Sequence, residues 1–288
     1  MTISNSPLVD CLAVDAHGHY GRYLRDPEEP LTHGFMSASA AEVARRASRI
    51  GVGTTIVSPL AGLLPRGRAD TVAANESAYR EVPEVDGLLQ YVIVNPLQPE
   101  TYLQARRMFS AKWCVAIKIH PDEHCYRIAD YGDEIFSFAS EVGAPLMTHS
   151  GCPNSLPDAF VPFANRYREV RLLLAHLGHG GGEGDGLRPD LQVRAVQAAR
   201  HGNIWVDTSS TRSILPGLIE WAVQEIGDDR LLFGSDTPLY HVAMQRTRID
   251  TAEIKPAAKR MILRENAERF FSLGMLKPAI IKSSDETA

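Results

Sequence analysis

The sequence has few cysteines, no long hydrophobic run and no block of like charge. No two of the four cysteines in the 288 residues have C-x-x-C spacing, so reduced thiols and a cytoplasmic location are expected rather than a disulfide framework. No window approaches the roughly 18 apolar residues of a membrane span, and the start MTISNSPLVDCL does not resemble a signal peptide. Lys and Arg number 30 against 35 Asp and Glu. Without a basic cluster, we expect neither nucleic acid nor membrane as a partner.

Short runs rich in Val, Ile and Leu alternate with longer helical patterns along most of the chain. Eight strands are expected, at residues 11–19, 53–59, 87–96, 114–121, 144–151, 170–178, 203–210 and 230–238. Repeated strand–helix alternation implies a parallel sheet, so the predicted fold is α/β, a (β/α)8 TIM barrel, with an open doubly wound sheet as the alternative. Residues 255–274 predict a C-terminal helix. We expect one domain over residues 1–288, with its core at about 11–274 and a poorly ordered tail at 275–288.

Histidines gather at the C-terminal ends of the expected strands, where the active site of such a barrel forms. His17 and His19 end the first strand and share one face, because alternate side chains of a strand point the same way. His149 and His176 end the fifth and sixth strands, and Asp236 ends the eighth. An isolated H-x-H motif is a weak signal. Several imidazoles with one carboxylate, however, suit Zn²⁺ best, with Mn²⁺, Fe²⁺ or Co²⁺ as alternatives.

The H-x-H motif, the later histidines and the stretches IKIHP, FGSDTP and ILRENAERFF together resemble the amidohydrolase superfamily, and in particular its amidohydrolase-2 branch. That branch contains hydrolases and also non-oxidative decarboxylases similar to aminocarboxymuconate-semialdehyde decarboxylase. The resemblance covers roughly residues 11–274. It implies a metal-dependent enzyme and a possible homodimer. It also implies that the metal ligands are His17, His19, His149 and Asp236, with His176 either binding a second metal or polarising the substrate.

Lys118 lies on the same strand face as His120, two residues apart, and is expected to reach the same cavity. In binuclear relatives the corresponding lysine is carboxylated and bridges two metals. An unmodified lysine could instead bind an acidic substrate. Because an ammonium group beside a divalent cation is unfavourable, either solution is physically reasonable. We expect one metal and an unmodified Lys118, as in the mononuclear branch.

Other polar residues near the strand ends are candidate substrate contacts. His120 could contact the substrate or cap the strand. Ser209 and Arg212 could hold a substrate carboxylate, since an arginine fork suits that geometry, although Arg212 could equally lie on the surface. Tyr20 is expected to line the pocket. Cys152 is expected to be a small packing residue.

These residues predict a hydrolase of a small molecule with an amide, ester or lactone carbonyl, in which a metal activates water. Asp236 would accept the proton of the water and deliver it to the leaving group, and His176 would stabilise the oxyanion. A decarboxylase on the same scaffold is the alternative enzyme. A barrel that has lost catalysis and only binds a ligand is a third possibility, which the intact ligand set argues against.

Overall fold

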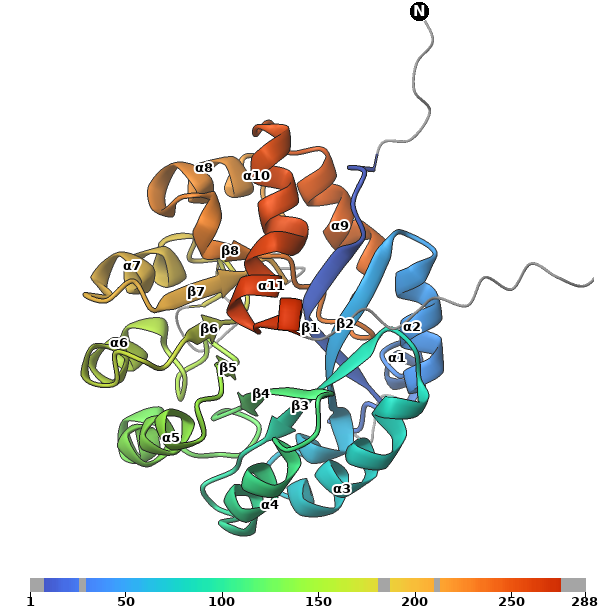
Figure 1. Ribbon diagram of the computed structural model, residues 1–288, viewed down its shortest axis with the longest axis vertical. Helices are drawn as coiled ribbons and strands as arrows, with labels where there is room; N and C mark the ends of the chain where they lie inside the picture. Colours follow the sequence, from blue (N-terminus) through green and yellow to red (C-terminus); the bar gives the residue numbers. More distant parts are fainter. Residues whose placement is uncertain (1–7, 26–29, 181–186, 210–212, 276–288) are drawn as a thin grey trace, which may run out of the picture.

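The structure, a computed structural model, describes residues 8–25, 30–180, 187–209 and 213–275. Eight strands form one sheet of parallel neighbours in the order β1 to β8, and Figure 1 shows them arranged around a common centre. The strands are β1 (Ala13–Tyr20), β2 (Val52–Pro59), β3 (Leu88–Ile93), β4 (Cys114–Ile119), β5 (Leu146–Thr148), β6 (Leu172–Leu174), β7 (Ile204–Asp207) and β8 (Leu231–Leu232). The consecutive order excludes a doubly wound sheet, in which the strand order reverses. The predicted (β/α)8 barrel is confirmed.

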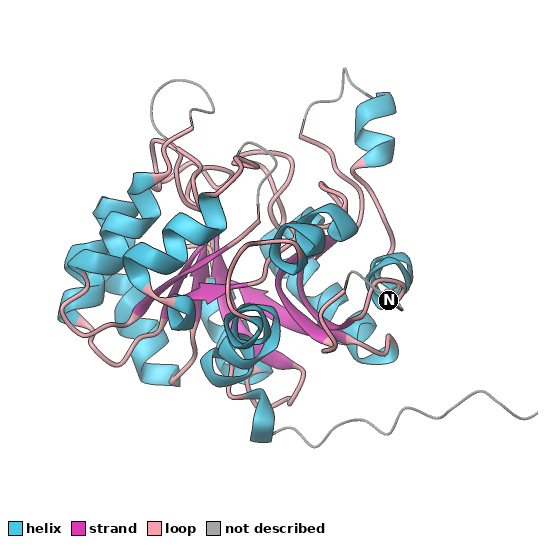
Figure 2. Ribbon diagram, turned by 90° about the horizontal axis from the view of Figure 1, so that it is seen from above, coloured by secondary structure: helices cyan, strands magenta, loops and turns pink. Residues whose placement is uncertain are grey.

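Helices follow the strands and surround them (Figures 1 and 2). No helix among the described residues is long and apolar enough to cross a membrane. The α-helices are α1 (Pro30–Phe35), α2 (Ala40–Ser48), α3 (Thr71–Glu81), α4 (Glu100–Met108), α5 (Ile128–Val142), α6 (Pro157–Arg166), α7 (Asp190–Ala198), α8 (Leu218–Ile226), α9 (Val242–Asp250), α10 (Pro256–Arg260) and α11 (Asn266–Phe270).

The C-terminal helix expected at 255–274 is interrupted. A π-helical turn, Met261–Glu265, separates α10 from α11. In this turn the carbonyl of Ile262 accepts a hydrogen bond of 2.8 Å from the backbone N–H of Phe233, which follows β8. One carbonyl of the π-helical turn is therefore hydrogen-bonded to the residue after β8 and is not used in a regular α-helical hydrogen bond. The predicted tail lies outside the described residues from 276 onward.

The barrel interior is filled by side chains from successive strands. Buried residues from seven strands, together with Phe270 and Phe271, form one cluster, which places α11 across one end of the barrel (Figure 1). These strand residues are Val14, Ala16, Ile56, Tyr91, Ala116, Met147, Leu173 and Leu232. The polar side chains described below therefore gather at the other end, above a packed apolar floor.

The barrel closes between its last and first strands through individual hydrogen bonds. Ala16 donates to the carbonyl of Phe233 at 2.8 Å, Asp236 donates to the carbonyl of His17 at 2.7 Å, and His19 donates to the carbonyl of Thr237 at 2.6 Å. Gly18 and Thr237 form an isolated parallel bridge. The segment after β8 thus lies directly beside the H-x-H segment of β1.

Candidate metal centre and active site

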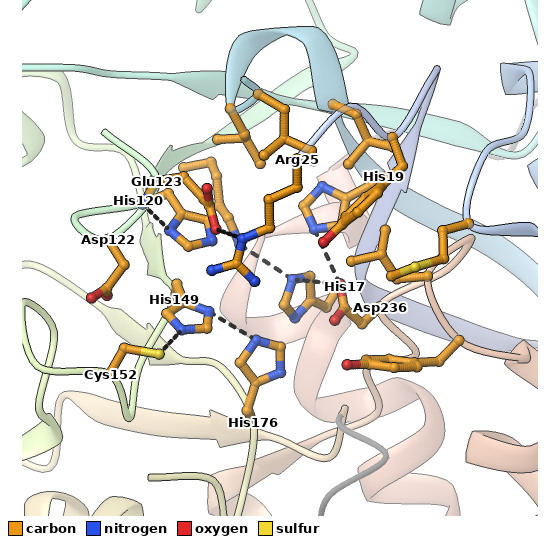
Figure 3. Close-up of a pocket in the computed structure, with 18 of the residues that line it drawn as sticks. His17, His19, Arg25, His120, Asp122, Glu123, His149, Cys152, His176 and Asp236 are labelled. Carbon is orange, nitrogen blue, oxygen red and sulfur yellow. Dashed lines mark hydrogen bonds and ion pairs between the residues drawn. The ribbon is translucent and has the colours of Figure 1, made fainter. Parts of the chain in front are cut away.

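Three predicted ligands converge at this closure. The Nε2 atom of His19 lies 3.2 Å from Oδ1 of Asp236, and Nε2 of His17 lies 3.5 Å from the same oxygen. One ligand atom from each of the three residues lies within 4.8 Å of the others, and all three are buried. Figure 3 shows them side by side on one wall of a pocket. Two imidazoles and one carboxylate at this spacing could hold a borderline divalent ion.

The outer ring nitrogens of both histidines are already engaged. Nδ1 of His17 lies 2.9 Å from Oδ2 of Asp207 and 3.0 Å from Oγ of Ser209. Nδ1 of His19 lies 2.9 Å from Oγ of Ser58, on the neighbouring strand β2. When Nδ1 of His17 donates its hydrogen to Asp207, the lone pair of the neutral ring is on Nε2. Burial also lowers the pKa of His17 well below its usual range, which favours the neutral ring. The residues present therefore fit a metal ion.

The backbone at the strand ends departs from regular geometry. His176 and Asp236 have positive φ angles of 69° and 59°, a conformation that costs energy for residues other than glycine. Asp236 is held there by its hydrogen bond to the His17 carbonyl, and the carboxylate of Asp207 accepts a 3.0 Å hydrogen bond from the backbone N–H of His176. Both residues are thus fixed with their side chains turned into the pocket.

His176 and His149 form a row of imidazole rings that begins beside His17. The rings of His17 and His176 lie 5.0 Å apart, and Nε2 of His176 is 3.1 Å from Nδ1 of His149. Nε2 of His149 faces Cys152, with its Sγ at 3.2 Å. The structure does not bring His149 into the group of His17, His19 and Asp236. Its assignment to the same ion stays a prediction that would require its ring to turn.

Lys118 reaches the centre of the pocket, as expected. Its Nζ lies 3.2 Å from Nε2 of His17 and 2.8 Å from Sδ of Met147. Among the residues that the structure describes, no carboxylate lies within ion-pair distance of it. Burial lowers the pKa of Lys118 to about 8, although Asp236 and Asp207 oppose this shift. This buried amine is therefore available to an anionic group that enters the pocket.

The expected substrate contacts are placed differently from one another. His120 lines the pocket and stacks on His149, with ring centroids 4.4 Å apart. Tyr20 does not reach the pocket, because it follows His19 on the opposite face of β1 and packs with Ala38, Val43 and Val82. Arg212 lies outside the described residues.

Ser209 is also not a substrate contact, as the structure places it. Its hydroxyl donates a 2.5 Å hydrogen bond to Asp207 and faces Nδ1 of His176 at 2.8 Å. The side chain is fully buried beneath the histidines and does not line the pocket. It orients His17 and His176 instead.

Several pocket residues were missed by the sequence analysis. Arg25 reaches into the pocket and pairs with Glu123 at 3.1 Å (Figure 3). Cys152, expected only to pack, faces His149. His179 also lines the pocket, 3.7 Å from Sγ of Cys152. One signal was visible: His149-x-x-Cys152 and His176-x-x-His179 repeat one spacing after neighbouring strands.

Comparison with protein families decides the membership of the chain. The family model described as Amidohydrolase matches residues 14–273. The chain belongs to the amidohydrolase family. The predicted resemblance is thus confirmed over nearly the whole barrel. A search of the curated proteins found no match.

Several solved structures share the fold of this amidohydrolase-family chain. The 2,6-dihydroxybenzoate decarboxylase from Rhizobium has a TM-score of 0.71 at 13% identity, covering 92% of this chain and 99% of that one. Dihydroxybenzoic acid decarboxylase from Polaromonas, with bound manganese and the inhibitor 2-nitroresorcinol, has a TM-score of 0.68 at 15% identity, covering 92% and 98%. The 5-carboxyvanillate decarboxylase from Sphingomonas paucimobilis has a TM-score of 0.67 at 16% identity, covering 90% and 98%.

These neighbours correct the functional prediction. The hydrolase predicted from the sequence is wrong as the leading assignment, because these three neighbours are decarboxylases. Membership of the amidohydrolase family does not distinguish the two, since one scaffold hosts several chemistries. A metal site is supported by the His and Asp group, and the ion in the Polaromonas enzyme is manganese.

Proposed function

We propose that the protein is a metal-dependent, non-oxidative decarboxylase of small aromatic carboxylates. The observation that carries the proposal is the buried Lys118, which faces the ligand group and has no carboxylate partner among the described residues. A negatively charged substrate compensates a buried cation, whereas a neutral amide, ester or lactone does not. The fold shared with decarboxylases of hydroxylated benzoates supports the same choice.

The pocket lining combines apolar side chains with cations, which suits an acidic molecule that carries an apolar ring. Apolar side chains from the segments after β1, β2 and β8 line part of it, where an aromatic ring could lie. These side chains are Met36, Leu60, Leu63, Leu64 and Leu239. The cations Lys118 and Arg25 stand at the polar side, and the guanidinium of Arg25 suits a carboxylate.

His17, His19 and Asp236 would hold one divalent ion. Their nitrogen and oxygen donors are compatible with either Mn²⁺ or Zn²⁺. The ion would supply positive charge that orients the substrate and stabilises negative charge developing on it.

Asp236 would move the proton. Its Oδ1 faces both histidines, so Oδ2 is the oxygen that would take up and release a hydrogen. In the reaction, Oδ2 accepts a proton from water and passes it to the substrate carbon that bears the carboxylate. The carbon–carbon bond then breaks, its electron pair returns to the ring, and the carboxylate leaves as CO₂. Lys118 binds the carboxylate before it leaves and thereby fixes which carbon lies next to Asp236.

The test is a substrate screen with the purified protein supplied with Mn²⁺ or Zn²⁺. Hydroxylated benzoates are offered together with amides, esters and lactones, and both CO₂ and hydrolysis products are measured. We expect CO₂ and the decarboxylated arene in equal amounts, and loss of both in Asp236→Asn. Asp133→Asn, at an exposed ion pair with Arg166, is the matched control. Hydrolysis of a neutral substrate without CO₂ release from any carboxylate would contradict the proposal.

A further inference from the structure

A second cavity lies at the end of the barrel opposite the metal centre. Its volume is about 310 Å³, at the lower end of the roughly 300–1,000 Å³ of small-molecule sites. Arg171 directly precedes β6, Trp205 is the second residue of β7, and Arg230 directly precedes β8. The π-helical turn and α11 complete the lining (Figure 1). The cavity is therefore formed where three neighbouring strands begin, whereas the metal ligands lie where strands end.

The cavity is positively charged. The guanidinium groups of Arg171, Arg230 and Arg269 line it together with one carboxylate, that of Asp229. Three positive charges and one negative charge give the lining a formal charge of +2. The carboxylate of Asp229 lies 3.7 Å from the guanidinium of Arg230, too far for a hydrogen bond. Among the residues that the structure describes, no carboxylate is hydrogen-bonded to any of the three arginines.

Aromatic rings hold two of these arginines in place. The guanidinium of Arg230 lies over Trp205, 4.9 Å from the ring centroid, and that of Arg171 lies over Phe270 at 5.9 Å. The two rings contact each other edge to face, with centroids 5.3 Å apart. A guanidinium that stacks on a ring does so with its flat face, so the N–H groups at its edge stay available to an acceptor.

Arg106 on α4 provides a comparison. It also lies over an aromatic ring, but it donates two hydrogen bonds of 2.8 Å to the carboxylate of Glu141. The hydrogen bonds that Arg171 donates within the described part of the chain come from Nη1 alone, to the carbonyl of Arg269 at 3.1 Å and to Oγ of Ser272 at 3.3 Å. Burial lowers the pKa of Arg171 below its usual value, so an anion bound beside it would be stabilising.

We propose that this cavity binds the phosphate group of a small phosphate monoester. Such a group carries about −1.5 to −2 charge at pH 7 and has three acceptor oxygens, whereas a carboxylate would neutralise only half of the charge of the lining. Guanidinium forks also suit phosphate oxygens. The organic part of the ester would lie against the apolar side chains of Met261 and Phe270. The inference does not rest on the proposed decarboxylation, because the cavity is at the other end of the barrel.

Modification of arginine by phenylglyoxal, mapped by mass spectrometry on the full chain, tests the site without a variant. The probe is n-butyl phosphate. We expect it to slow modification of Arg171 and Arg230 and to leave that of Arg106 unchanged. Inorganic phosphate should protect the same two arginines only at higher concentration, because it buries no apolar surface. Equal modification of Arg171 and Arg230 with and without butyl phosphate would overturn the proposal, and equal protection by inorganic phosphate would overturn a monoester as the ligand.

Isothermal titration calorimetry with n-butyl phosphate gives the affinities. Arg171→Gln and Arg230→Gln should each weaken binding by about 10–100-fold, the loss expected for a charge-assisted hydrogen bond, with circular dichroism to confirm the fold. Arg106→Gln is the matched control, and Lys118→Met tests binding in the other pocket; both should keep the wild-type affinity. Loss of affinity in Lys118→Met but not in Arg171→Gln would place the ligand at the metal centre and overturn the proposal. Equal weakening in Arg106→Gln would show a general charge effect and would also overturn it.

Discussion

The carboxylate of Asp207 should control metal affinity without touching the metal. Its Oδ1 accepts hydrogen bonds from the backbone N–H groups of Ser209 and His176, at 2.9 Å and 3.0 Å, while Oδ2 faces Nδ1 of His17 at 2.9 Å. In Asp207→Asn the amide oxygen can keep the Oδ1 contacts. The NH₂ group then replaces Oδ2 and donates to Nδ1 of His17, which moves the ring hydrogen to Nε2. A protonated Nε2 cannot bind the metal.

The expected loss of metal affinity is roughly 10–100-fold, the usual effect of removing the partner of a ligating histidine. This corresponds to about 1.4–2.8 kcal/mol of binding free energy. The assay is competition for Mn²⁺ or Zn²⁺ against a chelator of known affinity, with circular dichroism to confirm the fold.

Asp15→Asn is the matched control for this prediction. Asp15 is equally buried and contacts the backbone N–H of His17, but not its ring. Its other oxygen accepts a hydrogen bond from the hydroxyl of Ser235, which can rotate to accept from an amide. Asp15→Asn should therefore keep its metal. If Asp207→Asn bound metal as tightly as the wild type, or if both variants lost it equally, the argument from the ring hydrogen would be refuted.

Further predictions concern the metal and the residues around it. His17→Ala should lose bound metal, measured by elemental analysis, whereas exposed His201→Ala should keep it; full metal content in His17→Ala would contradict the ligand assignment. Asp236→Asn should lower kcat by about 10²–10⁴-fold, the range for losing a proton-transfer group, and unchanged turnover on an identified substrate would exclude this role. Lys118→Met should raise KM for a carboxylated substrate by about 10–100-fold, from a charge-assisted hydrogen bond of about 1.5–3 kcal/mol; an unchanged KM would remove Lys118 from the carboxylate site. Chelation should lower the melting temperature, because an ion at 100 times its Kd adds about 2.7 kcal/mol to stability; equal melting of both forms would argue against a bound ion.

The fold was predictable from the sequence because local patterns specify it. Apolar runs bounded by turn residues located all eight strands. The predicted C-terminal ends of some strands were wrong, because the hydrogen-bonded pairing with the neighbouring strand stops several residues before the apolar run does. The strand expected at 144–151 has ladder pairing only over Leu146–Thr148, and the one expected at 230–238 only over Leu231–Leu232. Beyond these short ladders the chain turns toward the pocket. At Asp236 this requires a positive φ angle, which no apolar pattern encodes.

The ligand residues were predictable in part, and their supporting contacts were not. His17 and His19 follow from strand alternation, since they lie two residues apart. The contact of His17 with Asp207 joins residues 190 positions apart, and a single sequence gives no measure of such a pairing. Tyr20 was misplaced because its position next to the H-x-H motif suggested the pocket, whereas alternation already placed it on the other face. For Tyr20, the alternation of side chains along the strand predicted the observed orientation better than proximity to the H-x-H motif did.

The closure of the barrel and the metal centre depend on the same few atoms. β8 has only two residues in ladder pairing, so the contact between the last and first strands rests on single hydrogen bonds rather than a long ladder. Two of these bonds belong to the segments that carry the proposed ligands: Asp236 donates to the carbonyl of His17, and His19 donates to the carbonyl of Thr237. Any loss of pairing at this seam would separate Asp236 from both histidines. An ion bound by these three side chains would hold the same seam closed, because it would link the first strand to the last. A substitution that disturbs this seam is therefore expected to weaken both metal binding and the closure of the barrel.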